Sequence, residues 1–241
     1  ANNTAVGLNA LHGNTTASNN TAVGMQSLND NTTGTMNTAV GSQALNANTT
    51  ANHNTAVGYS AMVVNTTGYQ NIAVGNYALN ANTTASKNTA VGYYSLGVNT
   101  TGAENTAVGH LALHNNTEGA NNVAVGVNSL VENTTASYNT GIGYAALSVS
   151  TTGERNTGIG YGAGDAITTG SYNTAVGMGS VGGVTTGSYN TAIGYESLHA
   201  ANNTASNNTA VGTYALFATT TGHGNVAIGF EALKDNTTGN E

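Results

Sequence analysis

The chain has 241 residues, only 5% of them charged, and its net charge is −7. Soluble domains usually carry about 25% charged residues, so the composition argues against an ordinary globular domain. The three basic residues are too few for binding nucleic acids or anionic membranes, because both need a positive surface. The chain has no cysteine for disulfides or thiolate metal sites, and no apolar run long enough to span a membrane.

One short unit repeats along the whole chain. A motif of the form Asn-Thr-Ala-Val-Gly begins fourteen times at intervals of seventeen residues, except for one interval of eighteen between Asn190 and Asn208. Seventeen residues are too few for a helical hairpin, and the glycines and β-branched residues oppose helix. We therefore predict an all-β fold, a parallel β-solenoid (β-roll) of about 14 coils of 17 residues. We expect two short strands and two turns in each coil.

The first position of every unit is asparagine. Stacked coils lie about 4.8 Å apart, which brings equivalent residues into contact. Asparagine amides at that spacing can hydrogen-bond to one another up the stack. We predict an asparagine ladder formed by Asn3, Asn20, Asn37, Asn54, Asn71, Asn88, Asn105, Asn122, Asn139, Asn156, Asn173, Asn190, Asn208 and Asn225.

The second to fifth positions alternate as a strand does. Thr and Val share one face, and the small Ala and Gly share the other, where a neighbouring layer can approach closely. The fourth position is always Val or Ile and the ninth is usually Leu, so we expect both to be buried. The predicted structural core at the fourth position is Val6, Val23, Val40, Val57, Val74, Val91, Val108, Val125, Ile142, Ile159, Val176, Ile193, Val211 and Ile228.

The later positions predict turns. Asn-Thr-Thr-Gly or Asn-Thr-Thr-Ala is a typical turn sequence, and we expect it to be exposed. These turns contain Asn-x-Thr triplets, which we interpret as a product of composition rather than as glycosylation sites. Several units carry a tyrosine at the sixth position, which either stacks on sugar rings or is partly buried; we favour partial burial. These residues are Tyr59, Tyr93, Tyr144, Tyr161 and Tyr195.

We interpret residues 1–241 as a single repetitive β-solenoid domain without caps, with irregular coils around residues 139–187. Gly141 and Gly158 replace the usual alanine there. Uncapped strand edges favour end-to-end stacking or a place within a longer polypeptide. Each coil also offers little apolar surface, so lateral trimerisation is expected to thicken the core. Three chains would then meet through either their Ala/Gly faces or their Val/Ile positions.

The first half of the unit resembles the head repeat of trimeric autotransporter adhesins (the YadA-like head), whose pattern is close to N-S-x-A-I-G-x-x-A/S. Residues 54–61 and 190–197 show the likeness, with one residue fewer before the Val/Ile-Gly pair. The whole unit is also similar to 17-residue repeats of bacteriophage tail fibres and large surface proteins. The resemblance implies a left-handed, homotrimeric β-roll on an extracellular fibre. The turn is longer here than in the adhesin repeat.

The sequence shows no catalytic, cofactor-binding or metal-binding constellation, so we do not expect an enzyme or a cofactor. The histidines fall on no common position of adjacent coils, and His110 and His114 have a helical spacing within a segment that reads as strand and turn. The turns lack the regular Asp of calcium-binding β-rolls. Asp30, Asp165 and Asp235 are too scattered to support a hydroxyl nucleophile.

We therefore expect a structural or adhesive extracellular fibre segment: an adhesin head or shaft, a tail fibre or a self-assembling filament subunit. The predicted partners are other copies of the chain, in a lateral trimer, an end-to-end filament or both, and cell-surface glycans. We expect no nucleic acid and no membrane insertion, and a location on the cell surface or a virion fibre. The alternative is an ice-binding or carbohydrate-binding solenoid that uses Thr or Tyr ladders. The turn pair Thr49–Thr50 argues against ice binding, because adjacent residues point opposite ways.

Overall fold

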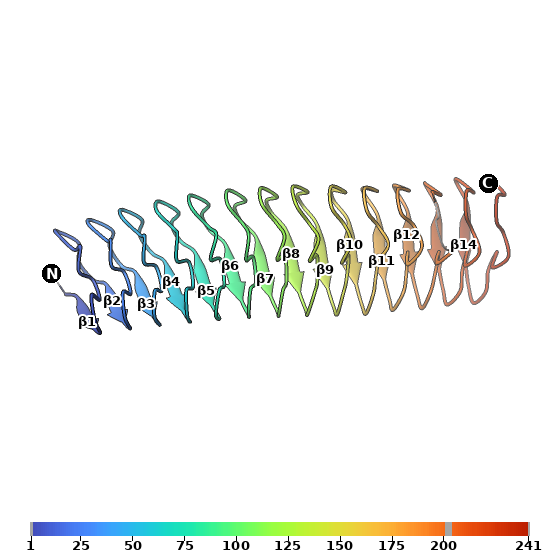
Figure 1. Ribbon diagram of the computed structural model, residues 1–241. Coiled ribbons are helices and arrows are strands. Elements are labelled where there is room, and N and C mark those ends of the chain that lie inside the picture. The colour runs from blue at the N-terminus through green and yellow to red at the C-terminus, as the bar shows by residue number, and fades with distance from the viewer. Residues whose placement is uncertain (1, 201–203, 241) are drawn as a thin grey trace. The chain divides into compact units, whose positions relative to one another are not determined.

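The computed structural model describes residues 2–200 and 204–240 and shows an all-β protein. Each repeat unit contributes one short strand, and all strands run parallel to their sequence neighbours, which confirms the predicted β-solenoid (Figure 1). The described residues contain no helix that is long and apolar enough to cross a membrane. The two strands per coil that the sequence suggested are reduced to one strand of three residues, followed by turns.

The coils group into two compact units, residues 1–121 and residues 122–241, each with seven strands. The strands of the first unit are β1 (Thr4–Val6), β2 (Thr21–Val23), β3 (Thr38–Val40), β4 (Thr55–Val57), β5 (Ile72–Val74), β6 (Thr89–Val91) and β7 (Thr106–Val108). Those of the second are β8 (Val123–Val125), β9 (Thr140–Ile142), β10 (Thr157–Ile159), β11 (Thr174–Val176), β12 (Thr191–Ile193), β13 (Thr209–Val211) and β14 (Val226–Ile228).

Within each unit the strands pair in the register that the repeat dictates. Thr55 of β4 lies opposite the equivalent threonine of β3, and Val57 lies opposite the equivalent valine. The backbone continues this pairing past the strand, where the Gly58 N–H donates to the Val40 carbonyl at 2.8 Å. Equivalent side chains therefore stack directly along the coils of a unit.

The core of most coils is formed by the third-position alanine and the ninth-position leucine. Ala56 and Leu79, for example, are fully buried. The prediction that the fourth-position Val and Ile residues form the core is wrong. None of the fourteen is buried, and eight of them are among the exposed large hydrophobic residues: Val6, Val40, Val74, Val125, Ile142, Ile159, Ile193 and Ile228.

The interior of a coil is too narrow for a β-branched side chain. Gly158 occupies the third position of its unit. Even the Cβ atom that an alanine would add there would lie 2.8 Å from Cγ of Leu147 and 2.7 Å from the Ala163 carbonyl oxygen. Alternation along the strand then forces the second and fourth positions outward. The small residue of the pair thus points into the coil, and Val or Ile points to solvent.

The backbone after the strand alternates between right- and left-handed conformations. Tyr77, Leu79 and Lys87 have φ values of +60°, +50° and +62°, and the equivalent residues of nearly every other unit do the same. This conformation costs a non-glycine residue about 1–2 kcal/mol. The left-handed residues donate their N–H groups to the coils on either side. The Tyr77 N–H donates to the preceding coil at 2.9 Å, and the Leu79 N–H donates to the following coil at 3.1 Å.

The fifth-position glycines allow close contact between coils of the same chain. Gly58 has φ +136°, and a Cβ atom there would lie 2.6 Å from the backbone of Gly75 in the next coil. The eighth-position Ala and Ser are also buried within their own chain, except Ala10 and Ala232. The small residues therefore serve packing inside the solenoid, and they lend no support to a trimer formed through Ala/Gly faces.

The coils of residues 139–187 keep the ladder of paired strands. Where one of their residues is smaller than the repeat predicts, another apolar residue fills the space. Gly164 replaces the ninth-position leucine, and Ile167, three residues later, is fully buried in the space that this leaves. A Cβ atom on Gly164 would lie 3.1 Å from Cδ1 of Ile167 and 2.7 Å from Cδ2 of Leu147. The apolar volume is therefore shifted along the chain rather than lost.

Candidate functional site

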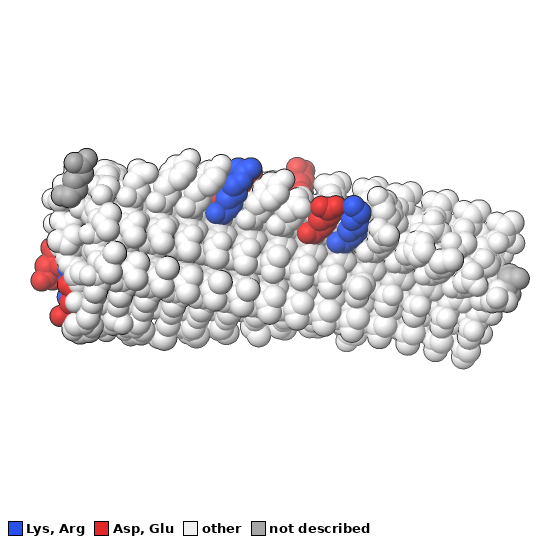
Figure 2. Space-filling model, turned by 180° about the vertical axis from the view of Figure 1, so that it is seen from behind, with Lys and Arg blue, Asp and Glu red and all other residues white. Residues whose placement is uncertain are grey.

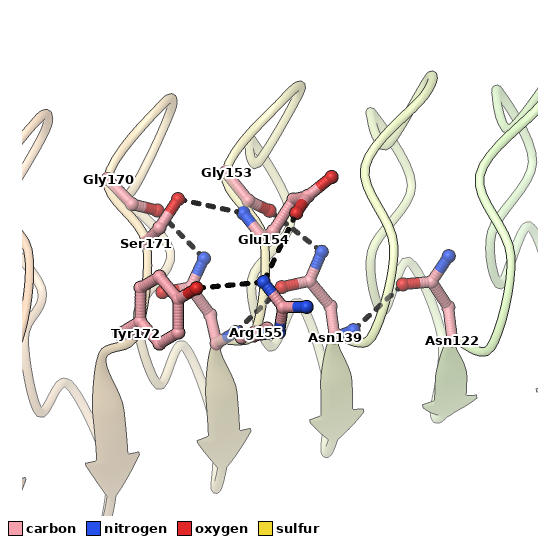
Figure 3. A network of polar contacts seen from close by, with 9 residues as sticks. Asn122, Asn139, Gly153, Glu154, Arg155, Gly170, Ser171 and Tyr172 are labelled. Atoms are coloured by element: carbon pink, nitrogen blue, oxygen red, sulfur yellow. Dashed lines mark hydrogen bonds and ion pairs between the residues drawn. The ribbon is translucent and has the colours of Figure 1, made fainter.

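The first-position asparagines form the predicted ladder, with a bonding pattern different from the one expected. The N–H of Asn139 donates to Oδ1 of Asn122 at 2.9 Å, and Nδ2 of Asn139 donates to the Gly153 carbonyl at 2.8 Å (Figure 3). Each buried amide thus bonds mainly to backbone, joining its own coil to the next. Direct amide-to-amide contacts at this position occur only in some coils, as between Asn190 and Asn173 at 3.1 Å.

A second ladder, at the twelfth position, was missed by the sequence reasoning. There the amides do bond to one another: Nδ2 of Asn48 donates to Oδ1 of Asn31 at 2.8 Å, and Nδ2 of Asn82 donates to Oδ1 of Asn65 at 2.8 Å. These residues are fully buried, so the expectation that the whole turn is exposed is wrong at its asparagine. The same burial keeps them from carrying a glycan in the folded chain, which supports the compositional origin of the Asn-x-Thr triplets.

The outer face of the sheet is the most regular surface of each unit. We use this name for the second- and fourth-position side chains of the strands, which point to solvent. The fourth position is Val or Ile throughout, and the second is Thr in all strands but β5, β8 and β14. Neither position carries a charge in any unit. Along a sheet, such residues repeat at about 4.8 Å between strands and about 6.6 Å within a strand.

The few charges lie away from these positions, and each of the three basic residues is paired with an acidic one. All three basic residues form exposed ion pairs: Lys87 with Glu104 at 2.9 Å, Arg155 with Glu154 at 3.7 Å, and Lys234 with Glu231 at 2.6 Å. The hydrogen bond from Lys87 to Glu104 raises the pKa of the lysine. On the face drawn in Figure 2, the charged side chains form small isolated groups on an otherwise uncharged surface. Pairs this exposed contribute little to stability.

Aromatic side chains form stacks along the coils. Three pairs of tyrosines one repeat apart have nearly parallel rings with centroids about 5 Å apart: Tyr77–Tyr94 at 4.6 Å, Tyr144–Tyr161 at 5.1 Å and Tyr172–Tyr189 at 4.9 Å. Arg155 extends the last stack, since its guanidinium donates to the Tyr172 hydroxyl at 2.8 Å (Figure 3). The five sixth-position tyrosines are between 38% and 59% exposed, so the chain itself covers them partly, as predicted, and leaves their remaining surface to solvent.

The stacks make a poor platform for sugars. Rings that lie nearly parallel at this distance cover one another's faces and present their edges to solvent, whereas a sugar ring stacks on an open face. Other tyrosines meet edge to face, such as Tyr59 with Tyr77 and Tyr195 with Tyr214. Tyr195 is also held by a hydrogen bond to Glu196, which raises the pKa of its phenol to about 12.

Within the described residues there is no cluster of three potential metal-ligating side chains and no pocket. His110 and His114 each contact a different ring, Tyr93 and Tyr94 respectively. Asp165 is half-buried, and burial raises the pKa of its carboxyl group while nearby His199 opposes the shift.

No family model matches the chain, and no curated protein or solved structure is significantly similar to it.

Proposed function

We propose that the chain is a structural segment of an extracellular fibre, and that copies of it associate laterally as a homotrimer through the outer face of the sheet. The observation that carries this proposal is the row of solvent-facing Val and Ile side chains on the seven strands of each unit. A soluble monomer rarely leaves a contiguous apolar patch larger than a few hundred Å² uncovered. Covering this row with the same row of another copy would bury it.

The chemistry of the face suits a second copy of the same chain. The face has no charged side chains, so it can form no salt bridges with a partner. Apolar contact and shape complementarity would stabilise the complex instead. Threonine beside valine allows close packing together with hydrogen bonding. The resemblance to trimeric adhesin heads and tail fibres is consistent with three copies, and it is the basis for proposing the cell surface or a virion fibre as the location.

The mechanical role follows from the continuous ladders. Within each unit, neighbouring coils are joined by backbone bonds and by a buried asparagine, so stability is distributed along the array.

Sedimentation velocity over a concentration series tests the proposal. The wild-type chain is expected to sediment as a trimer. Val57→Asp places a charge on the outer face, so it should sediment as a monomer with an unchanged circular dichroism spectrum, because this side chain points outward. Thr50→Asp, in an exposed turn, is the matched control and should remain trimeric. A monomeric wild-type chain at tens of micromolar, or a trimeric Val57→Asp variant, would contradict the proposal.

A second candidate function uses the same face. The stacked threonines of the strands lie on a sheet rather than in a turn, which removes the objection raised by Thr49 and Thr50. A regular array of hydroxyl and methyl groups on a sheet can order water, and this favours ice binding by a monomer. A freezing-point assay separates the candidates: thermal hysteresis that is lost in Thr55→Leu and retained in Thr50→Leu would support ice binding.

A further inference from the structure

We propose that the stacked tyrosine pairs are sites of oxidative cross-linking, at which a dityrosine bond joins adjacent coils of one chain. The pairs are Tyr77–Tyr94, Tyr144–Tyr161 and Tyr172–Tyr189. Each consists of equivalent positions exactly one repeat apart, so the solenoid itself holds the two rings together. The inference concerns contacts within a single chain and does not depend on the oligomeric state or on the proposed fibre.

Tyrosine is the only residue type in this chain that can form such a bond on oxidation. The chain has twelve tyrosines and neither cysteine nor tryptophan, so no disulfide can connect its coils. In Tyr172–Tyr189 the ring planes are 7° apart with centroids 4.9 Å apart, and in Tyr144–Tyr161 they are 9° and 5.1 Å apart. Rotation about the side-chain bonds brings ring carbons ortho to the hydroxyls into reach.

The pairs are accessible to an oxidant. Tyr144 and Tyr161 are 49% and 59% exposed, and Tyr172 and Tyr189 are 43% and 59% exposed. The Tyr172 hydroxyl accepts a hydrogen bond from the Arg155 guanidinium, so the Tyr144–Tyr161 pair is the better test of the proposal. Tyr77 and Tyr94 are less exposed and also contact other rings, so we expect them to react more slowly.

The chemistry requires a peroxide and a haem peroxidase, which are the oxidant and catalyst that we assign. The peroxidase removes one electron and the phenolic proton from each tyrosine. The two phenoxyl radicals couple through ortho carbons, and the ring protons at those carbons move to the oxygens, which restores both phenols. One carbon–carbon bond forms, two hydrogens are lost from the chain, and one hydrogen peroxide is reduced to two waters.

Such a bond would close a loop of seventeen residues between neighbouring coils. A cross-link of this kind restricts the unfolded chain as a disulfide does. In an array stabilised by nearest-neighbour contacts, it would also keep two coils together when their hydrogen bonds open. Oxidation would therefore stabilise the solenoid against local unfolding at the coils that carry the pairs.

Trypsin provides a direct readout, since it can cut only after Lys87, Arg155 and Lys234. Cleavage after Arg155 separates Tyr144 from Tyr161, and cleavage after Lys87 separates Tyr77 from Tyr94. The full chain is treated with peroxidase and hydrogen peroxide across a dilution series, then unfolded, digested and analysed by mass spectrometry. We expect peptides 88–155 and 156–234 to remain joined, with a mass two hydrogens below their sum, at every dilution.

Tyr161→Phe preserves the ring stack and removes the phenol, so peptides 88–155 and 156–234 should separate completely. Tyr69→Phe is the matched control, because Tyr69 is 47% exposed but contacts no other ring among the described residues; it should leave the joined peptides unchanged. Joined peptides in Tyr161→Phe, products that mainly involve Tyr69, or linkage that disappears on dilution would each overturn the proposal.

Discussion

Replacement of one buried ladder asparagine should weaken the solenoid measurably. In the wild-type chain, Oδ1 of Asn71 accepts the N–H of Asn88 at 2.9 Å, and Nδ2 of Asn71 donates to the Ala85 carbonyl at 2.9 Å. In Asn71→Ala the buried Asn88 N–H loses this partner, which costs about 1–3 kcal/mol, whereas the Ala85 carbonyl keeps its bond from Asn82. Adding about 1 kcal/mol for the second lost bond gives a total of about 2–4 kcal/mol.

Calorimetry and amide hydrogen exchange measure this loss. For a chain of this size, Tm should fall by roughly 4–16 °C if unfolding stays cooperative. Exchange should accelerate most in the coils on either side of Asn71, because an array unfolds locally. Asn76→Ala is the matched control: the Asn76 side chain is exposed, and its Oδ1 accepts the Tyr59 N–H at 3.0 Å. Equal effects of the two substitutions would refute the assignment of stability to the buried ladder.

Three further substitutions test the packing and the electrostatics. Gly58→Ala should prevent correct stacking, seen as lost β-signal in circular dichroism, because its Cβ would lie 2.6 Å from the backbone of the following coil. In thermal unfolding of the dissociated monomer, Leu79→Ala should cost about 2–5 kcal/mol, whereas Val74→Ala on the outer face should cost below about 1 kcal/mol. Burial raises the pKa of Asp165, and the nearby His199 opposes this shift. The contribution of Asp165 to stability is therefore present below its unfolded pKa of 3.8 and is lost as the pH rises through the folded pKa. Asp165→Asn should flatten that part of the curve of stability against pH.

The period of the sequence was sufficient to predict the architecture. Seventeen-residue spacing predicted one coil per unit, which the structure confirms, and a ladder of first-position asparagines, which the hydrogen bonds within each unit show. The invariant fifth-position glycine indicated close backbone approach, which Gly58 shows. The burial of the ninth position was also predicted correctly from its preference for Leu. The left-handed backbone conformation of these leucines was not predicted.

The sequence misled at the fourth position, because a hydrophobic residue repeated in every unit usually indicates a core. Alternation along the strand showed that position three must face opposite to position four, but it could not show which of the two faces inward. The width of the coil decides this, and it depends on how the ninth-position Leu fills the interior. The twelfth-position ladder was hidden for a similar reason: Asn-Thr-Thr is a typical exposed turn, and only the stacking of coils buries its asparagine.

Cysteine labelling tests the central claim, that the third position faces the core and the fourth faces a partner. Because the chain has no cysteine, one introduced thiol is the only target for a maleimide. In the assembled protein we predict slow labelling of Val57→Cys and fast labelling of Thr50→Cys. In the diluted monomer Val57→Cys should react quickly, while Ala56→Cys stays protected in both states. Equal rates for Val57→Cys and Thr50→Cys in the assembly, or fast labelling of Ala56→Cys in the folded monomer, would contradict the claim.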